Sequence, residues 1–457
     1  MTSAALCEAV AGLRFADLPD ETVAAARRVL LDATGVMLGA SGLSPEVAPF
    51  VTLAAGAPGP SAILGTGRRA AAAMAALANG AMAHALDYED AFDLRPGHPN
   101  ASLVPALLAL AQDRAAMGGP VSGERLLTAL VAGCEVACRL GLACGQDMEL
   151  GHWYPPPIVA GLGAAVGAAK LLGLDARGIR DALSLALCQV TMPGEIKHSP
   201  GTVIRAVREA FPAQAAVMAA LLARAGVAGF EQPLEGPGGF YALYAGGLMR
   251  AEVLEAPLAA PFWIERLTFK PWPSCRGTHP FIELALELRG RHGFAAEDVA
   301  EVVCRVDAVQ AMLVEPLARK QAPATLIDAK FSVPFCTALA LVRGRVTLDT
   351  LGEAALGDAE VLELAARVRA EAAGAVDWRR GSGGALAIRL KDGREFSAET
   401  RDALGCPDRP LDEARLVAKF VDCAGRAAVP LGEGAAAELA GAILAVESCG
   451  DVGALFG

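Results

Sequence analysis

Apolar residues recur with helical spacing over most of the first 225 positions of the chain. Residues 20–38 carry apolar side chains on one helical face, with Asp20 placed to cap the start and Gly39 to end the helix. The same pattern predicts helices over residues 69–86, onward from Ala101, 124–142 after a capping Ser122, 158–172, 175–189 and 207–225.

The pattern changes near residue 265. Shorter apolar runs predict strands over residues 266–269, 299–306, 385–390 and 394–398, and the last two flank a Lys-Asp-Gly turn typical of a hairpin. Helices are expected over 278–288 and 328–342, and helical patterns return over 411–423 and 432–448. The chain is therefore predicted to be mainly α. We expect a large helical domain built from both chain ends (1–267 and 405–457), with a smaller inserted α+β lid domain (268–404).

Composition narrows the class of protein. Hydrophobic residues make up 54% and charged residues 20%, which excludes global disorder. The formal net charge is −11, without basic runs, so neither a nucleic acid nor an anionic membrane is expected as the main partner. The N-terminus lacks a signal-peptide pattern, and no uninterrupted apolar run reaches about 18 residues. A cytoplasmic protein without a membrane span is the expectation.

The sequence offers no recognisable metal or cofactor motif. The 11 cysteines show no repeated spacing, and Cys134 and Cys138 have no second pair to complete a zinc site. Neither a dinucleotide-binding glycine motif nor a phosphate-binding loop occurs. We therefore expect no metal.

Residues 84–100 place four acids, an arginine and two histidines between two apolar helices. A loop bounded by buried helices often delivers its polar groups to a cleft, and a carboxylate beside an imidazole orients it for proton transfer. His98 is the predicted acid or base, Asp87 the carboxylate that orients it, and Tyr88 a substrate contact. The alternative is a solvated loop without a special role.

Two further segments concentrate cations. Residues 269–280 contain Lys270, Cys275, Arg276 and His279, and they end where a helix begins, which favours an anion site. A stiff interdomain linker, with Cys275 as an inert buried thiol, is the alternative.

Residues 195–208 contain the cationic groups Lys197, His198, Arg205 and Arg208. In a chain of net charge −11, such clusters favour a pocket for a small polyanion; a solvated surface stripe is the alternative.

At these segments the sequence resembles the MmgE/PrpD family, which includes 2-methylcitrate dehydratase, cis-aconitate decarboxylase and iminodisuccinate epimerase. The resembling stretches are ALDYEDAF, GHPNASLVPALLALA, GLGAAVGAAKLLGLD, REAFPAQAAVMAALLA, FKPWPSCRGTHP and DAKFSVPF, and they follow the family order across almost the whole chain. The resemblance implies a helical domain from both chain ends, an α+β lid and a homodimer. It also implies metal-free and cofactor-free chemistry on di- or tricarboxylic acids.

The resemblance does not fix one reaction. Compared with the cis-aconitate decarboxylase branch, Asp87, His98 and Lys270 match the acid, histidine and lysine of its active site. Five other positions depart from the pattern of this branch. Ala91 stands where a threonine is expected, and Pro155 and Cys275 stand where histidines are expected. Arg205 takes the place of a lysine, and Phe335 that of a tyrosine. His152 lies three residues before the position of the first of these histidines. Decarboxylation of cis-aconitate is therefore disfavoured.

We expect an enzyme that moves a proton at a carbon next to a carboxylate, most simply a dehydratase. The roles expected are His98 as acid or base, Asp87 as its orienting group, and Lys270, Arg276 and Arg205 as carboxylate ligands. His279, Lys197, His198 and His152 are the further donor candidates. An epimerase is the first alternative, and a catalytically quiet carboxylate-binding relative is the second. We expect the four residues Asp87, His98, Lys270 and Arg276 to converge on one cleft.

Overall fold

The computed structural model describes residues 2–95, 97–199 and 202–456. It is mainly α-helical, which confirms the predicted fold class. The chain divides into two compact units, here called unit 1 (Met1–Leu267 with Asp412–Gly457) and unit 2 (Thr268–Leu411). The second boundary falls after Leu411, whereas the sequence placed it after residue 404.

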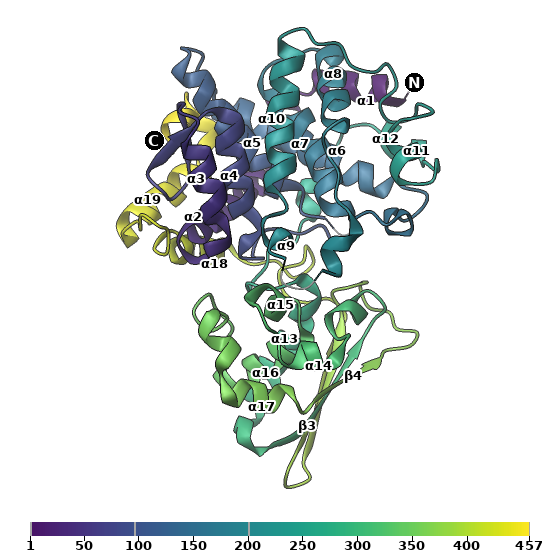
Figure 1. Ribbon diagram of the computed structural model, residues 1–457, viewed down its shortest axis with the longest axis vertical. Coiled ribbons are helices and arrows are strands. Elements are labelled where there is room, and N and C mark those ends of the chain that lie inside the picture. Colours follow the sequence, from purple (N-terminus) through teal and green to yellow (C-terminus); the bar gives the residue numbers. More distant parts are fainter. Residues whose placement is uncertain (1, 96, 200–201, 457) are drawn as a thin grey trace. The chain divides into compact units, whose positions relative to one another are not determined.

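Unit 1 is a bundle of helices that includes both ends of the chain (Figure 1). Its helices are α1 (Thr2–Gly12), α2 (Asp20–Leu43), α3 (Ala48–Ala55), α4 (Ala72–Ala85), α5 (Pro99–Ala116), α6 (Gly123–Leu142), α7 (Pro155–Leu171), α8 (Ala176–Leu187), α9 (Ile204–Val207), α10 (Ala210–Arg224), α11 (Phe240–Tyr244), α12 (Ala251–Glu255), α18 (Glu413–Ala424) and α19 (Glu433–Leu444). A short antiparallel pair, β1 (Ser61–Ile63) and β2 (Arg68–Ala70), occupies the start of the predicted helix 69–86.

Small residues allow the central helices of unit 1 to pack closely. A Cβ atom on Gly133 of α6 would lie 2.9 Å from the Gly163 carbonyl of α7, and one on Gly167 would lie 2.9 Å from the Ala129 carbonyl. These distances leave no room for a side chain, so the two backbones approach where glycine faces glycine or alanine. The alanine- and glycine-rich composition is thus a packing requirement of α6 and α7.

One predicted cap is confirmed, whereas another cap and one helix end are wrong. The side chain of Ser122 accepts a hydrogen bond from the first turn of α6, as expected. Asp20 does not cap α2: it is the first residue inside the helix, and Pro19 occupies the cap position without a side-chain hydrogen bond. At its other end, α2 continues past Gly39 to Leu43. Gly39 lies inside the helix because a Cβ there would already be 3.2 Å from Cys423 of α18. The glycine serves close helix packing and does not end the helix.

Unit 2 is built on a four-stranded sheet in the order β4-β3-β5-β6. Strands β3 (Val299–Val306), β5 (Gly384–Leu390) and β6 (Glu395–Thr400) pair antiparallel, and β4 (Val368–Ala372) pairs parallel to β3. The predicted hairpin is confirmed, with Gly393 at φ 92° in its turn. Alternate residues of β5 are buried, so one face of the sheet packs on a core that it shares with α13 (His279–His292) and α16 (Val333–Arg343).

Two predictions for unit 2 need correction. Residues 266–269 form no strand: a 3₁₀ turn, Trp263–Arg266, ends there, and the backbone of Phe269 bonds to the Gly405 carbonyl instead. The predicted helix over 328–342 is two helices, α15 (Leu326–Lys330) and α16. Ser332 begins the second, because its side chain accepts from the Phe335 backbone.

One helical stretch, Ile204–Arg224, is long and apolar enough to cross a membrane by length and composition alone. Since 72% of its apolar window is buried within the protein, it resembles a core helix. The helices Asp20–Leu43 and Pro45–Ala55 pass the same test only when joined across a 91° bend.

Candidate active site

The loop that joins α4 to α5 brings two histidines together. His84 lies in the last turn of α4, and His98 is the residue that precedes α5. Between them Asp87 adopts φ 51°, a left-handed conformation that is costly for a non-glycine residue, and its backbone N–H donates to the His84 carbonyl at 2.7 Å. The two imidazole centroids lie 5.3 Å apart.

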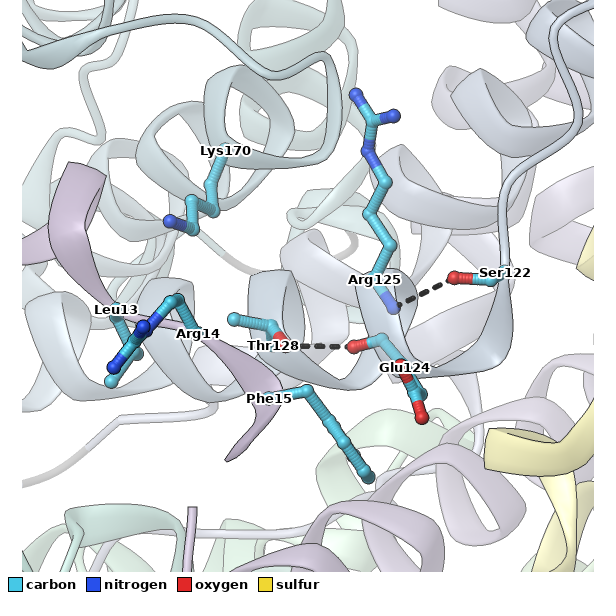
Figure 2. A pocket seen from close by; sticks show the side chains of 8 residues that line it. All are labelled: Leu13, Arg14, Phe15, Ser122, Glu124, Arg125, Thr128 and Lys170. Atoms are coloured by element: carbon cyan, nitrogen blue, oxygen red, sulfur yellow. Dashed lines mark hydrogen bonds between the residues drawn. The ribbon is translucent and has the colours of Figure 1, made fainter. Parts of the chain in front are cut away.

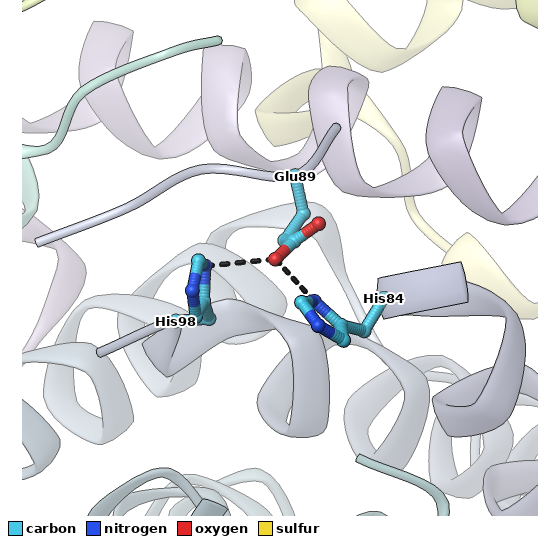
Figure 3. Close-up of side chains that lie close together, drawn as sticks. All are labelled: His84, Glu89 and His98. Carbon is cyan, nitrogen blue, oxygen red and sulfur yellow. Dashed lines mark hydrogen bonds and ion pairs between the residues drawn. The ribbon is translucent and has the colours of Figure 1, made fainter. Parts of the chain in front are cut away.

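Glu89 lies between the two imidazoles (Figure 3). Its Oε1 atom is 2.5 Å from Nδ1 of His84 and 2.8 Å from Nδ1 of His98. The carboxylate and the His84 side chain are fully buried, whereas the His98 side chain keeps 15% of its surface exposed. Of the three residues, His98 alone is therefore open to solvent or to a ligand.

The hydrogen-bond partners fix the proton on the His98 ring. Its Nδ1 lies 2.8 Å from Glu89 Oε1 and 2.9 Å from the Asp90 carbonyl oxygen, and both of these atoms are acceptors. Nδ1 must therefore carry the proton, which leaves the lone pair on Nε2 when the ring is neutral. This arrangement of carboxylate, imidazole and available Nε2 is that of a general base.

Arg208 fixes the state of the second imidazole. Its Nη1 donates to His84 Nε2, so the proton of His84 lies on Nδ1 and is donated to Glu89. Burial, together with the Arg208 charge, lowers the pKa of His84 to about 3, and the ring stays neutral. Arg208 also pairs with Glu209 at 3.2 Å, and Glu209 accepts from Ser102 at 2.6 Å. A continuous buried network thus runs from Ser102 to His98.

Cations and an aromatic ring extend this network. The ring centroid of Tyr154, which precedes α7, is 5.2 Å from Arg208 Cζ and 5.4 Å from Lys197 Nζ. Lys197 also forms an ion pair with Glu149. The segment 195–208 thus brings two cations to the Tyr154 ring, and each of them is also paired with a carboxylate, Lys197 with Glu149 and Arg208 with Glu209.

A second cluster of buried charges, on α2 and α18, holds the loop 84–100 in place. Lys419 of α18 lies 2.6 Å from Asp32 of α2 and donates to the Tyr88 carbonyl at 2.6 Å. Next to it, burial and the Asp32 charge raise the pKa of Asp90 to about 7. Asp90 accepts from the Asn100 amide at 3.0 Å, and its backbone carbonyl is the one that contacts His98. The cluster joins helices from both chain ends to the loop.

His84, Glu89 and His98 also form a group that could hold a metal ion, since their ligand atoms lie within 4.8 Å of one another. The spacing of these residues in the sequence did not predict such a set, because two of its members lie on either side of a loop. The protonation pattern does not fit a metal. Both Nδ1 atoms carry protons toward Glu89, His84 Nε2 is occupied by Arg208, and the guanidinium adds a positive charge beside the group.

We expect purified protein to gain no thermal stability from added zinc, iron or manganese, and to keep its activity in a chelator. A ligand that binds only the folded state raises Tm, so a metal site here would be visible in a melting experiment. One equivalent of tightly bound metal, with loss of activity on chelation, would contradict the hydrogen-bonded assignment of the three residues.

The other predicted residues of unit 1 are Tyr88, Arg205, His152 and His198. Tyr88 is held by α18: Lys419 Nζ is 3.8 Å from its ring centroid. Arg205 is half-buried in α9, one turn before Arg208. His152 and His198 are exposed, the first in a left-handed turn at φ 61°, and none of their described side-chain contacts joins them to Glu89 or His98. These two are therefore weaker donor candidates than Lys197.

Glu89 is the carboxylate at His98 Nδ1, a position that the sequence analysis assigned to Asp87. Asp87 is buried in the turn itself. Also missing from the predicted site were His84, Arg208 as a partner of His84, and Tyr154. The sequence did indicate the two segments from which His84 and Arg208 come, the loop 84–100 and the cationic segment 195–208, and both contribute residues to the network around His98.

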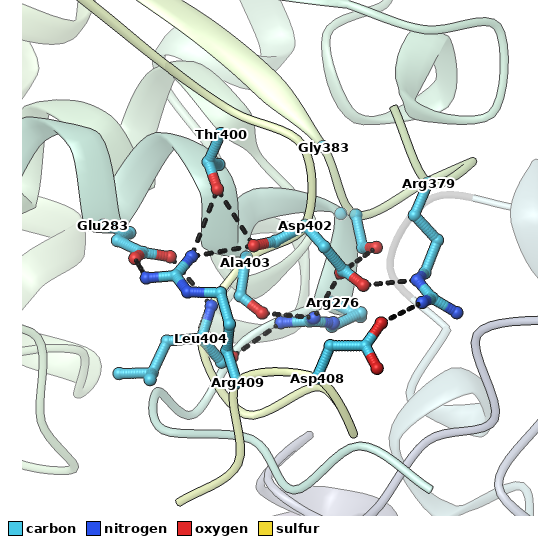
Figure 4. Close-up of polar contacts among 12 residues, drawn as sticks. Arg276, Glu283, Arg379, Gly383, Thr400, Asp402, Ala403, Leu404, Asp408 and Arg409 are labelled. Atoms are coloured by element: carbon cyan, nitrogen blue, oxygen red, sulfur yellow. Dashed lines mark hydrogen bonds and ion pairs between the residues drawn. The ribbon is translucent and has the colours of Figure 1, made fainter. Parts of the chain in front are cut away.

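Lys270, Cys275, Arg276 and His279 belong to unit 2. Arg276 donates to the carbonyls of Leu404 at 2.9 Å and Ala403 at 2.8 Å and pairs with Asp402 at 3.2 Å (Figure 4). These contacts hold the segment after β6. They favour a structural role for Arg276 over its predicted role as a ligand for a substrate carboxylate.

The remaining unit 2 candidates are enclosed. His279 is fully buried, donates from Nε2 to the Ser274 carbonyl at 3.1 Å, and packs on Trp272. Lys270 is fully buried and Cys275 half-buried. The predicted convergence of Lys270 and Arg276 with Asp87 and His98 stays a prediction.

A cavity of about 310 Å³ lies elsewhere in unit 1, between the segment after α1 and helices α6 and α7 (Figure 2). It is lined by Leu13, Arg14, Phe15, Ser122, Glu124, Arg125, Thr128 and Lys170. Arg14 is paired with Asp17, and Lys170 donates to the Ala11 carbonyl. None of the candidate site residues lines this cavity, so it does not mark the site.

The chain belongs to the MmgE/PrpD family. The model of the family's N-terminal domain matches residues 4–251, and that of its C-terminal domain matches residues 272–438. Among curated relatives, a cis-aconitate decarboxylase-like protein of Aspergillus oryzae is 28% identical, covering 79% of this chain and 78% of its own. The human cis-aconitate decarboxylase is 26% identical over 90% of this chain and 85% of its own, and that of Aspergillus terreus is 24% identical over 92% and 88%.

Proposed function

We propose that this protein is a lyase that removes water from a small di- or tricarboxylic acid, using His98 as the base. The observation that carries the proposal is the His98 ring, whose Nδ1 is held by Glu89 and the Asp90 carbonyl while its side chain stays partly exposed. Family membership and relatives named for a lyase activity on cis-aconitate support this class of substrate and reaction.

In the proposed reaction, Nε2 of His98 takes the proton from the carbon next to a substrate carboxylate. The electron pair of that C–H bond first stays on the substrate as a carbanion stabilised by the adjacent carboxylate, and it then forms the new double bond as the C–O bond of the neighbouring carbon breaks and hydroxide departs with a second proton. The buried Glu89 carboxylate stabilises the imidazolium that forms. Lys197 and Arg205 are the proposed ligands for substrate carboxylates, because they supply exposed or half-buried positive charge on the segment that contains Arg208.

Decarboxylation is less favoured than dehydration for this chain. Ala91, Pro155 and Phe335 carry no group that transfers a proton at positions where the resembling branch has one. Epimerisation remains an alternative that uses the same base. The buried network from Ser102 to His98 argues against the catalytically quiet relative, since a binding protein has no need of an oriented imidazole.

Proton NMR in deuterium oxide, with a panel of cis-aconitate, citrate, 2-methylcitrate and aspartate-derived diacids, tests this proposal. A dehydratase gives a new olefinic or hydrated product together with deuterium at the α-carbon. Exchange with inversion but without net product identifies an epimerase, and release of carbon dioxide identifies a decarboxylase. Binding of the test acids without any exchange of the α-proton would instead identify the protein as the catalytically quiet carboxylate-binding relative.

We also propose that the protein is a homodimer, as the family resemblance implies. Helix α10 exposes Phe211, Met218 and Leu222 on one face, each with at least 37% of its surface accessible, and Phe50 of α3 packs edge-on against Phe211. A continuous apolar face of this kind is typical of a contact between subunits.

Sedimentation of the wild-type protein is expected to give twice the chain mass, and Met218→Glu is expected to give the single-chain mass. A charge placed within an apolar contact loses its hydration without gaining a partner. The control is Leu243→Glu on α11, which is more exposed than Met218 (51% against 40%) but lies away from α10 in the sequence and should leave the mass unchanged. A monomeric wild type would remove the proposal.

A further inference from the structure

Tyr154 has a buried ring and an unusual electrostatic position. The residue is 7% exposed and precedes α7, and two cations lie near its ring: Arg208 Cζ is 5.2 Å and Lys197 Nζ 5.4 Å from the ring centroid. Cations at this distance from an aromatic ring attract its π-electrons, and they attract the negative charge of a phenolate more strongly. Each of the two cations comes from the 195–208 segment.

The hydroxyl group of Tyr154 differs from those of neighbouring buried tyrosines. Tyr244 donates to the Val190 carbonyl at 2.9 Å and Tyr241 to the Leu140 carbonyl at 3.3 Å. Within residues 2–95, 97–199 and 202–456, no group bonds to the Tyr154 hydroxyl, yet that oxygen is not among the buried atoms left without a partner. It therefore keeps contact with solvent. A buried ring with an open hydroxyl presents that hydroxyl to a ligand.

Arg208 connects this hydroxyl to the proposed base. The same guanidinium that lies beside the Tyr154 ring donates to His84, and the His84 ring lies 5.3 Å from that of His98. Tyr154 and His98 thus sit at two ends of one short network. At the next position Pro155 replaces the histidine expected from the family resemblance, so a second proton-transfer group is missing at the start of α7.

We propose that Tyr154 is the proton donor of the reaction in which His98 is the base. The inference rests on the proposed function of the site. As the C–O bond of the substrate breaks, its electron pair goes to the departing oxygen, which takes the proton from the Tyr154 hydroxyl and leaves as water. The phenolate that remains is stabilised by Arg208 and Lys197 and recovers a proton from solvent, while His98 releases to solvent the proton taken from carbon.

Tyr154→Phe tests the proposal because it removes only the hydroxyl, which makes no bond within the described protein. We expect turnover to fall about 100-fold or more, the usual effect of losing a general acid, with Tm unchanged. Exchange of the α-proton with deuterium oxide, which needs only His98, should persist. Tyr244→Phe is the matched control: it loses a hydrogen bond to Val190 but no predicted catalytic group, so its turnover should match the wild type.

Turnover of Tyr154→Phe within twofold of the wild type would overturn the proposal. An equal loss of exchange and turnover would also overturn it, since the hydroxyl would then act before the C–O bond breaks. These outcomes leave the role of His98 standing if His98→Asn abolishes exchange.

Discussion

Replacement of His98 by asparagine is expected to lower kcat about 10²- to 10⁴-fold while leaving the fold intact. The asparagine amide still donates toward Glu89 and the Asp90 carbonyl, so the loop keeps its hydrogen bonds, but no group remains to accept a proton at the position of Nε2. Although only 15% of the His98 side chain is exposed, asparagine keeps the donor at the position of Nδ1 and loses only the outer part of the ring. Turnover and Tm measured on one preparation check both parts of this expectation.

Two further variants separate proton transfer from orientation. Glu89→Gln should lower kcat less than His98→Asn, because the ring remains but its proton position and its stabilising charge are disturbed. Asp87→Asn should cost less again, as Glu89 is the carboxylate at Nδ1. If His98 were a structural loop residue, His98→Asn would lose Tm and keep kcat, and Tyr154 with Lys197 would become the candidate acid and base.

Local sequence signals predicted the elements whose ends are fixed by their own residues. The Ser122 cap and the hairpin at Gly393 depend on hydrogen bonds and φ angles within a few positions, so they are visible in the sequence. Gly39 failed as a helix end because its role depends on Cys423, almost 400 positions away. A glycine that permits close packing looks the same in a sequence as one that ends a helix.

In the candidate site, too, local features could be predicted from the sequence, whereas contacts between distant positions could not. The loop 84–100 and the segment 195–208 were predicted as sources of chemistry, and both contribute to the network around His98. Which of four neighbouring acids faces the imidazole was not predictable, because the left-handed turn at Asp87 breaks any regular periodicity. Arg208 was identified as a cation, but its contact with His84 joins positions separated by 124 residues.

Replacement of Lys419 by methionine is expected to destabilise the protein by about 3–5 kcal/mol, the usual cost of removing one partner of a buried ion pair. Lys419 is 5% and Asp32 0% exposed in their side chains, and their charged atoms are 2.6 Å apart. Methionine fills most of the space but leaves Asp32 as a buried charge close to Asp90, whose pKa is already raised by that charge. Urea unfolding measures the loss, and Lys391→Met in the exposed hairpin turn is the matched control.

A double variant, Asp32→Asn with Lys419→Met, distinguishes the ion pair from the anchor of the loop. Removing both charges should recover most of the lost free energy of unfolding, since no unpaired charge remains buried. The Tyr88 carbonyl still lacks the donor that Lys419 supplied at 2.6 Å, so the loop that carries Glu89 and His98 stays less well held. Turnover of the double variant should therefore remain below that of the wild type although stability returns. Recovery of both together would mean that α18 stabilises unit 1 without positioning the catalytic loop.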